Sequence, residues 1–203
     1  MRISEQRYAR ERRALDVASR LIDFEARTGT IRELTGLADG RIRKLSKACA
    51  LDGRSGAKSR HRGAAPRRVN YVLDKARSKT EAAALLGVCQ LMGITDPRDE
   101  GFDGGITRIA RAEQLCDAFW TFRYLLPQAS IGFEHMLLLL SEAVKGEDLV
   151  TAHCHDCRAF LVVDPLSLYG RLCPQCTENS PMGRMAPESI PYSRVAEESP
   201  AYR

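Results

Sequence analysis

The sequence predicts a mainly α-helical fold with a small zinc ribbon near its C-terminus. Three observations predict it: leucine and alanine recur at helical spacing along much of the 203 residues, aromatic residues are only 6% of the chain, and two CxxC pairs lie near its end. Apolar residues make up 44%, which is enough for a real core. The length suits one sizeable domain with an appendage, or two small domains.

The first helix is predicted to become regular only after a polar start. Residues 1–13 are charged, and we expect them to be a frayed helix start. Apolar residues then line one helix face as far as roughly Arg27, at Ala14, Val17, Ala18, Leu21 and Phe24.

Two shorter helices should complete segment 1–51. Thr30 and Glu33 fit a capping box for a helix that ends at Gly36, where the turn requires a positive φ. Asp39 is the expected N-cap of the next helix, whose inner side carries Ile42, Leu45 and Cys49.

This pair of helices fits the spacing of a DNA-binding helix-turn-helix, in which the second helix enters the major groove. That helix carries four cations on its other faces. We expect Arg41 and Lys44 to contact bases, and Arg43 and Lys47 to bind phosphate. The alternative is an ordinary helical hairpin with a solvated basic face.

A basic linker is predicted over residues 52–68, which are rich in Gly, Ser and Arg. Thirteen Lys and Arg face two Asp between Arg41 and Lys79, which indicates nucleic acid or, less often, an anionic membrane surface. The alternative is that the linker is a solvated, protease-sensitive loop. Its candidate DNA-binding residues are Arg60, Arg62, Arg67 and Arg68.

Residues 69–149 are predicted as a helical body. Helices are expected over residues 69–94, Thr107–Leu126 and Ile131–Lys145, with a loop over Asp96–Gly105 and Pro127 between the last two helices. Core packing is the expected role of three cysteines, Cys49, Cys89 and Cys116. It is also the expected role of an aromatic cluster, for which a partner surface is the alternative: Phe119, Trp120, Phe122 and Tyr124.

The strongest motif is C-x2-C-x15-C-x2-C within residues 150–176. Two such knuckles supply four soft ligands in a tetrahedron, so the spacing predicts one structural zinc ion at Cys154, Cys157, Cys173 and Cys176. His153 or His155 is the alternative ligand, and unligated or redox cysteines are the alternative roles. Phe160–Val163 suits a strand, and residues 177–203 are expected to be a disordered tail.

Several function classes are not expected. No apolar run is long enough for a transmembrane helix, and the charged N-terminus is not a secretory signal, so we expect a cytoplasmic protein. No phosphate-binding loop, HExxH motif or paired acid and base is present, so neither an enzyme nor a small-molecule substrate is expected. His61 and His135 are expected to serve surface or packing roles.

The chain resembles the FlhC family, the zinc-containing subunit of the bacterial flagellar master transcription activator. The resemblance lies in Arg20–Lys47, above all Leu34–Lys47, and in Phe133–Cys176 with its two knuckles. It implies a DNA-binding activator that forms a hetero-hexamer of four FlhD and two FlhC subunits and recruits RNA polymerase to promoters of flagellar operons. It also implies that the four cysteines bind zinc.

Two other functions are compatible with the same features. One is a protein-interaction adaptor, in which the zinc ribbon docks another protein and the basic region only keeps the chain soluble. The other is a divergent FlhC-like paralogue that regulates non-flagellar genes.

Overall fold

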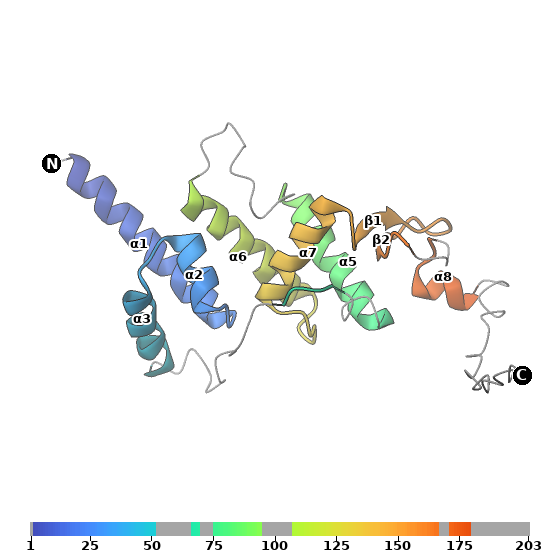
Figure 1. The fold of residues 1–203 in the computed structure, drawn as a ribbon, viewed down its shortest axis with the longest axis horizontal. Coiled ribbons are helices and arrows are strands. Elements are labelled where there is room, and N and C mark those ends of the chain that lie inside the picture. The colour runs from blue at the N-terminus through green and yellow to red at the C-terminus, as the bar shows by residue number, and fades with distance from the viewer. Residues whose placement is uncertain (1, 52–65, 70–74, 95–106, 167–170, 180–203) are drawn as a thin grey trace, which may run out of the picture.

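The protein is mainly helical, as the sequence predicts. The structure, a computed structural model, describes residues 2–51, 66–69, 75–94, 107–166 and 171–179 (Figure 1). Arg60, Arg62, His61, most of the expected linker, the loop over 96–105 and the tail from 180 lie outside these ranges. The elements are α1 (Arg2–Asp23), α2 (Thr28–Thr35), α3 (Asp39–Leu51), α5 (Ala76–Leu91), α6 (Arg108–Leu125), α7 (Phe133–Lys145), β1 (Val150–His153), β2 (Phe160–Val163) and α8 (Pro174–Asn179).

Helix α1 is longer at its start, and shorter at its end, than the sequence predicts. The frayed start over residues 1–13 was a wrong expectation, because the helix already begins at Arg2. Arginine pairs with α6 hold it: Arg13 Nε lies 2.9 Å from Glu113, and Arg20 lies 2.5 Å from Asp117. The predicted inner face is confirmed, with Ala14, Val17, Ala18 and Leu21 buried.

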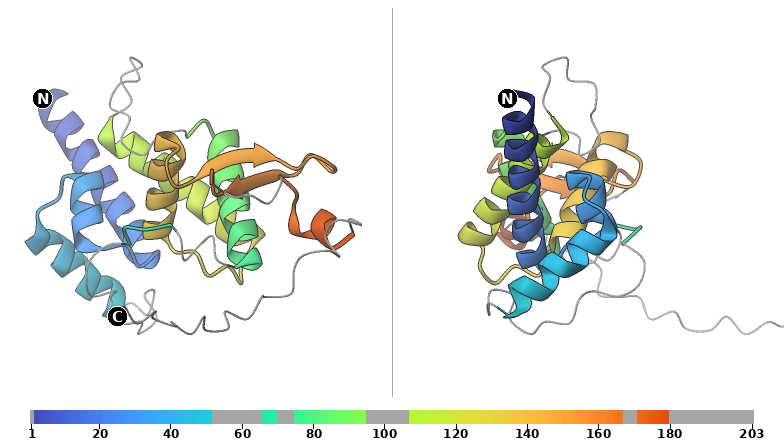
Figure 2. Two further views of the ribbon diagram at one scale, coloured as in Figure 1. Left: turned by 45° about the vertical axis from the view of Figure 1, so that its right-hand side comes forward. Right: turned by 90° about the vertical axis from the view of Figure 1, so that its left-hand side faces the viewer.

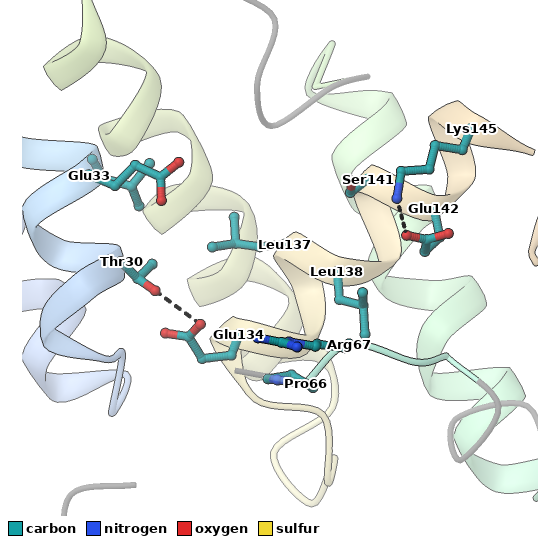
Figure 3. Close-up of a pocket in the computed structure, with 11 residues that line it drawn as sticks. Thr30, Glu33, Pro66, Arg67, Glu134, Leu137, Leu138, Ser141, Glu142 and Lys145 are labelled. Atoms are coloured by element: carbon teal, nitrogen blue, oxygen red, sulfur yellow. Dashed lines mark hydrogen bonds and ion pairs between the residues drawn. The ribbon is translucent and has the colours of Figure 1, made fainter. Parts of the chain in front are cut away.

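The capping box at Thr30 was wrong, because α2 begins two residues earlier, at Thr28. A distant carboxylate does the capping: Glu134 at the start of α7 accepts the Arg27 N–H at 2.8 Å and the Thr30 hydroxyl at 3.0 Å (Figure 3). The end of α2 is as predicted. Gly36 follows it at φ 74° and donates its N–H to the Arg32 carbonyl.

Helix α3 starts one residue earlier than expected. Asp39 is its first helical residue rather than its N-cap, and the Ala38 carbonyl accepts the first helical N–H groups. The Asp39 carboxylate instead lies 3.4 Å from Arg32. The predicted inner side is right, since Ile42 and Cys49 are buried.

Helix α6 lies at the centre of the fold and packs against α1, α2 and α5. Phenylalanine rings join α6 to the end of α1 and to α7: Phe119 lies 5.0 Å from Phe24, which follows α1, 5.4 Å from Phe133 of α7, and 6.1 Å from Phe122 of α6, centroid to centroid. Most of these contacts are edge-on or tilted, as aromatic pairs prefer. The predicted bounds of α6 are right to within a residue at each end, with Thr107 accepting the Ala110 N–H as N-cap.

Helix α5 is buried on most sides and holds a buried carboxylate. It starts at Ala76, so the helix expected from residue 69 was wrong at Val69, which is buried but not helical. Glu81 accepts the Ser130 N–H and hydroxyl, both at 2.8 Å, and the Arg77 Nε–H at 2.9 Å. Burial alone would raise the pKa of Glu81, but these hydrogen bonds outweigh it and lower that pKa.

Strands β1 and β2 form an antiparallel hairpin in which Val150 pairs with Val163 and His153 with Phe160. The hairpin packs on α5 through β2, and a Cβ placed on Gly87 would lie 3.8 Å from the Phe160 ring. Figure 2 shows the hairpin beside α5, at the opposite end of the molecule from α3. None of the described helices has both the length and the hydropathy of a membrane span.

Candidate functional site

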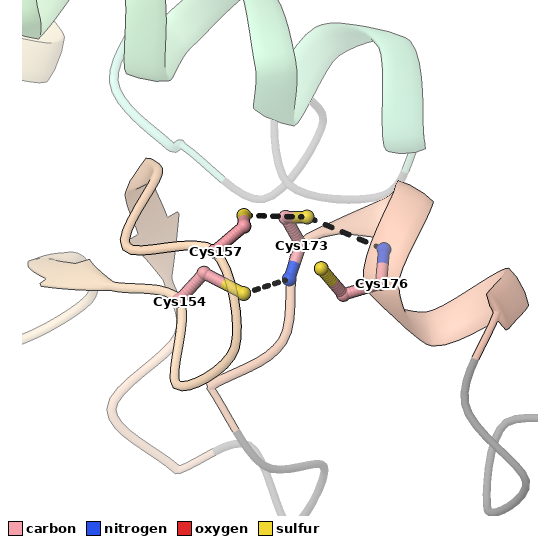
Figure 4. A group of neighbouring side chains, drawn as sticks. All are labelled: Cys154, Cys157, Cys173 and Cys176. Atoms are coloured by element: carbon pink, nitrogen blue, oxygen red, sulfur yellow. Dashed lines mark hydrogen bonds between the residues drawn. The ribbon is translucent and has the colours of Figure 1, made fainter.

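The hairpin and α8 bring the four predicted cysteines together (Figure 4). Cys154 follows β1, Cys157 lies in the turn between the strands, Cys173 precedes α8 and Cys176 lies within it. Their four sulfur atoms all lie within 4.8 Å of one another, so they can hold a metal ion.

The sulfur separations fit a bound ion better than a disulfide. A tetrahedral ion with metal–sulfur bonds of about 2.3 Å sets its sulfurs about 3.8 Å apart. The Cys157 and Cys173 sulfurs lie 3.6 Å apart, far beyond the roughly 2.05 Å of a disulfide. Four sulfur ligands also fill a tetrahedron, so a bound ion keeps no open position for a substrate.

Backbone N–H groups favour thiolate at this site. The Cys173 N–H donates to the Cys154 sulfur at 3.3 Å, and the Cys176 N–H donates to the Cys173 sulfur at 3.4 Å. Hydrogen bonds from the backbone of Cys157 and then Cys173 lower the pKa of Cys154 to about 6. Hydrogen bonding to the Cys173 and Cys157 side chains raises the pKa of Cys176. The Cys154 sulfur is therefore ready as an anion, and a cation would displace the protons of Cys157 and Cys176.

Local backbone geometry explains how the two knuckles meet. The Cys154 N–H donates to the Ala159 carbonyl at 2.8 Å, and Arg158 adopts φ 62° to close the turn. The His155 N–H donates to the Arg171 carbonyl at 2.9 Å, which ties the first knuckle to the chain that enters the second. The group of ligand atoms found among the described residues includes neither His153 nor His155, and both side chains are exposed.

Helix α8 corrects the expected boundary of the tail. The sequence places a disordered tail from Thr177, but Thr177–Asn179 continue the helix that contains Cys176. The Thr177 N–H and hydroxyl donate to the Cys173 carbonyl at 2.9 and 3.0 Å. The second knuckle is therefore the first turn of a short helix.

The cations predicted to bind DNA differ in their surroundings. Arg43, Lys44 and Lys47 are exposed on α3, and no ion pair joins them to any residue that the structure describes. Arg41, one of the two predicted base contacts, instead binds the carboxylate of Glu11 on α1. Arg67 and Arg68 are exposed in the segment over residues 66–69.

Arg67 borders a groove of about 320 Å³ between α2 and α7 (Figure 3). Its walls carry the carboxylates of Glu33, Glu134 and Glu142, and Lys145 binds Glu142 at 2.6 Å. These acidic groups make the groove a poor place for a polyanion.

The aromatic cluster of α6 divides between core and surface. The core prediction is right for Phe119 and Phe122, which are buried. It is wrong for Trp120 and Tyr124, which are 56% and 71% exposed and stack on each other with ring centroids 5.4 Å apart. A spacing of four residues puts the exposed pair on one helix face, while the buried pair faces the core.

Sequence reasoning missed two carboxylates of this molecule, Glu11 and Glu134. Glu11 binds a residue 30 positions away, and Glu134 binds residues 104 and 107 positions away. No local pattern marks either contact, because both depend on how the helices are assembled.

Family models and curated proteins give no significant match to this chain.

Proposed function

We propose that this protein is a DNA-binding transcription activator of the FlhC type, stabilised by one structural zinc ion at Cys154, Cys157, Cys173 and Cys176. The observation that carries the proposal is the outward face of α3. Three cations without a described ion-pair partner lie there, on a helix that follows α2 after a tight glycine turn.

Zinc is the ion that suits the cysteine cluster best. Four thiolates in a closed tetrahedral set are typical of structural zinc sites. Two of the ligand residues, Cys154 and Cys173, are buried, and their neighbours Ala152 and Leu161 are apolar. Zinc would thus stabilise the hairpin and take no part in catalysis.

Duplex DNA is the partner that the basic face fits. Exposed lysine and arginine side chains without nearby carboxylates gain most from a dense row of phosphates. The geometry of α2, Gly36 and α3 favours α3 as the helix that enters the major groove. Because Arg41 is bound to Glu11, we assign the first contacts to Lys44, Arg43 and Lys47.

The remaining parts of the proposal follow from the resemblance described above. The chain would act in the cytoplasm with an FlhD-like subunit, recruit RNA polymerase to flagellar promoters and change no substrate covalently. A divergent paralogue of this kind would keep the same chemistry and act on other genes.

A charge-matched pair of variants tests DNA binding. Lys47→Ala should weaken binding of a promoter duplex and lower the salt slope of log K by about 0.9, the value of one phosphate contact. Lys79→Ala removes an equally exposed lysine from α5 and should change neither quantity. Fluorescence anisotropy, with and without an FlhD-like subunit, measures both. No binding of the unaltered protein in low salt would contradict the proposal.

A protein-interaction adaptor is the second candidate, and one observation favours it. Trp120, Tyr124 and Leu125 on α6 are all more than half exposed, which is unusual for large apolar side chains at the end of a helix. If Trp120→Ala abolished capture of a partner protein while Lys47→Ala had no effect on any DNA complex, the adaptor would replace the activator.

A further inference from the structure

The free end of α1 carries cations that the proposed function does not use. Arg7, Arg10 and Arg12 are exposed, and the structure joins none of them to a carboxylate among the residues it describes. In Figure 1 this end of α1 extends beyond the other helices. The second view of Figure 2 shows α1 and α3 at the same end of the molecule.

Two contacts define which side of α1 faces α3. Glu11 binds Arg41, and the Ser19 hydroxyl lies 3.6 Å from the Cys49 thiol. Helix α1 therefore runs beside α3, with Glu11 near the first turn of α3. The opposite flank faces α6, which it contacts through Arg13.

Helical geometry places Arg7 and Arg12 near that side and Arg10 away from it. At about 100° per residue, Arg12 lies about 60° to one side of the direction midway between Glu11 and Ser19, and Arg7 lies about 80° to the other side. The two arginines therefore flank the α3 side of α1, whereas Arg10 lies about 140° from that direction. Arg7 also precedes Glu11 by one helical turn, so the two side chains are neighbours along the helix.

We propose that Arg7 and Arg12 of α1, together with Arg41 of α3, form a phosphate-binding strip for duplex DNA, and that Glu11 occupies a phosphate position in the free protein. This proposal rests on the proposed function and extends it to a second helix. In the complex, a DNA phosphate displaces Glu11 from Arg41, while Arg7 and Arg12 bind phosphates next to it.

The chemistry of the Glu11–Arg41 pair suits such an exchange. Arg41 is 50% exposed and Glu11 is 41% exposed, and ion pairs in such surroundings contribute little to stability. The arginine fork donates to carboxylate and phosphate oxygens in the same geometry. A strip of this kind fixes the position of the protein on DNA without reading its sequence.

The test compares salt slopes of DNA binding by the full zinc-loaded chain, in whichever form binds DNA, alone or with its FlhD-like subunit. The probe is a labelled duplex of about 30 base pairs, long enough to span flanking phosphates. Arg7→Ala/Arg12→Ala should lower the slope of log K against log salt by about 1.8, or 0.9 for each contact. Arg10→Ala, the control that points away from α3 on the same helix, should leave the slope unchanged. Equal thermal melts should accompany both, since all three side chains are exposed.

Glu11→Gln tests the exchange separately. Removing the competing carboxylate should strengthen binding about two- to fivefold, the range that an exposed ion pair accounts for. The same change in an Arg41→Ala background should have no effect. An Arg7→Ala/Arg12→Ala slope equal to that of the unaltered protein, or a Glu11→Gln affinity that does not rise, would overturn the strip while leaving the activator intact. Failure of the unaltered protein to bind any duplex would overturn both.

Discussion

The helical body and the cysteine hairpin are held together by different means. The body has one large apolar core that joins α1, α2, α3, α5, α6 and α7 through leucine, alanine and phenylalanine side chains. The hairpin side that carries the cysteines has a much smaller cluster: Ala152, Cys154, Leu161 and Cys173, with a few half-buried neighbours. We expect the first to be stable through burial alone and the second, which is much smaller, to need a bound metal ion.

The two regions nevertheless share one surface. Successive side chains of β2 point to opposite faces of the hairpin, so Val162 belongs to the large core and Leu161 to the cysteine cluster. The hairpin is therefore anchored on α5 by one face, while we expect its other face to depend on a bound metal ion. We therefore expect substitutions in the hairpin and substitutions in the helical body to have different measurable effects on metal content and stability.

Loss of a cysteine ligand should have the largest effect. Cys154→Ala should abolish stoichiometric zinc and release residues 150–179, because binding of structural zinc to such sites is worth about 10–16 kcal/mol. The helical body should keep most of its helix content. Metal analysis, far-UV circular dichroism and amide exchange of the hairpin would measure these effects.

A cysteine outside the cluster provides the control. Cys89→Ala changes a fully buried thiol of α5, whose pKa burial raises to about 12. It should destabilise the body slightly and keep the full metal content. Equal zinc loss in both variants would refute the assignment of ligands.

A cavity in the helical core should have the next largest effect. Phe122→Ala removes a fully buried ring and should lower the free energy of unfolding by about 3–5 kcal/mol. The protein should still bind its metal ion below the unfolding transition. Trp120→Ala, two positions away and 56% exposed, should cost less than about 1 kcal/mol in the same urea titration.

The smallest predicted effect concerns the buried carboxylate of the body. Glu81→Gln should cost about 1–3 kcal/mol at neutral pH, because Ser130 and Arg77 lose a charged acceptor. The pKa of Glu81 is lower in the folded state than in the unfolded state, so its contribution is complete above the unfolded pKa. That contribution is lost as pH falls through the folded pKa. Thermal melts of both proteins should therefore converge in acid, and a constant gap between them would contradict this account.

The sequence predicted what depends on local patterns. Residues Ala14, Val17, Ala18 and Leu21 repeat at helical spacing, and they are buried as expected. The positive φ of Gly36 and the meeting of the four cysteines also followed from short-range rules. The helix face and the glycine turn are each determined by residues a few positions apart. The cysteine cluster is determined by the spacing of its two CxxC pairs.

Features that depend on assembly were not predictable from one sequence. We expected residues 1–13 to be frayed because their apolar content is low, but the helix begins at Arg2, and the pairs of Glu11 with Arg41 on α3 and of Arg13 with Glu113 on α6 hold its later part. The sequence suggested a capping box at Thr30 and Glu33, because it does not show that Glu134 lies beside Thr30 in the folded protein. Trp120 and Tyr124 were expected in the core, because aromatic content alone does not show which face of α6 packs against other helices.

The contact between Glu134 and the start of α2 has a consequence for the order in which the protein is made. The Arg27 N–H and its acceptor are 107 residues apart, so α2 leaves the ribosome long before its cap exists. At about 5–20 residues per second, this delay lasts roughly 5–20 s. During that time the N-terminal helices also lack Phe119 and Phe133, the rings against which Phe24 packs. The nascent chain therefore carries its basic N-terminal segment for seconds before the segment acquires its final shape.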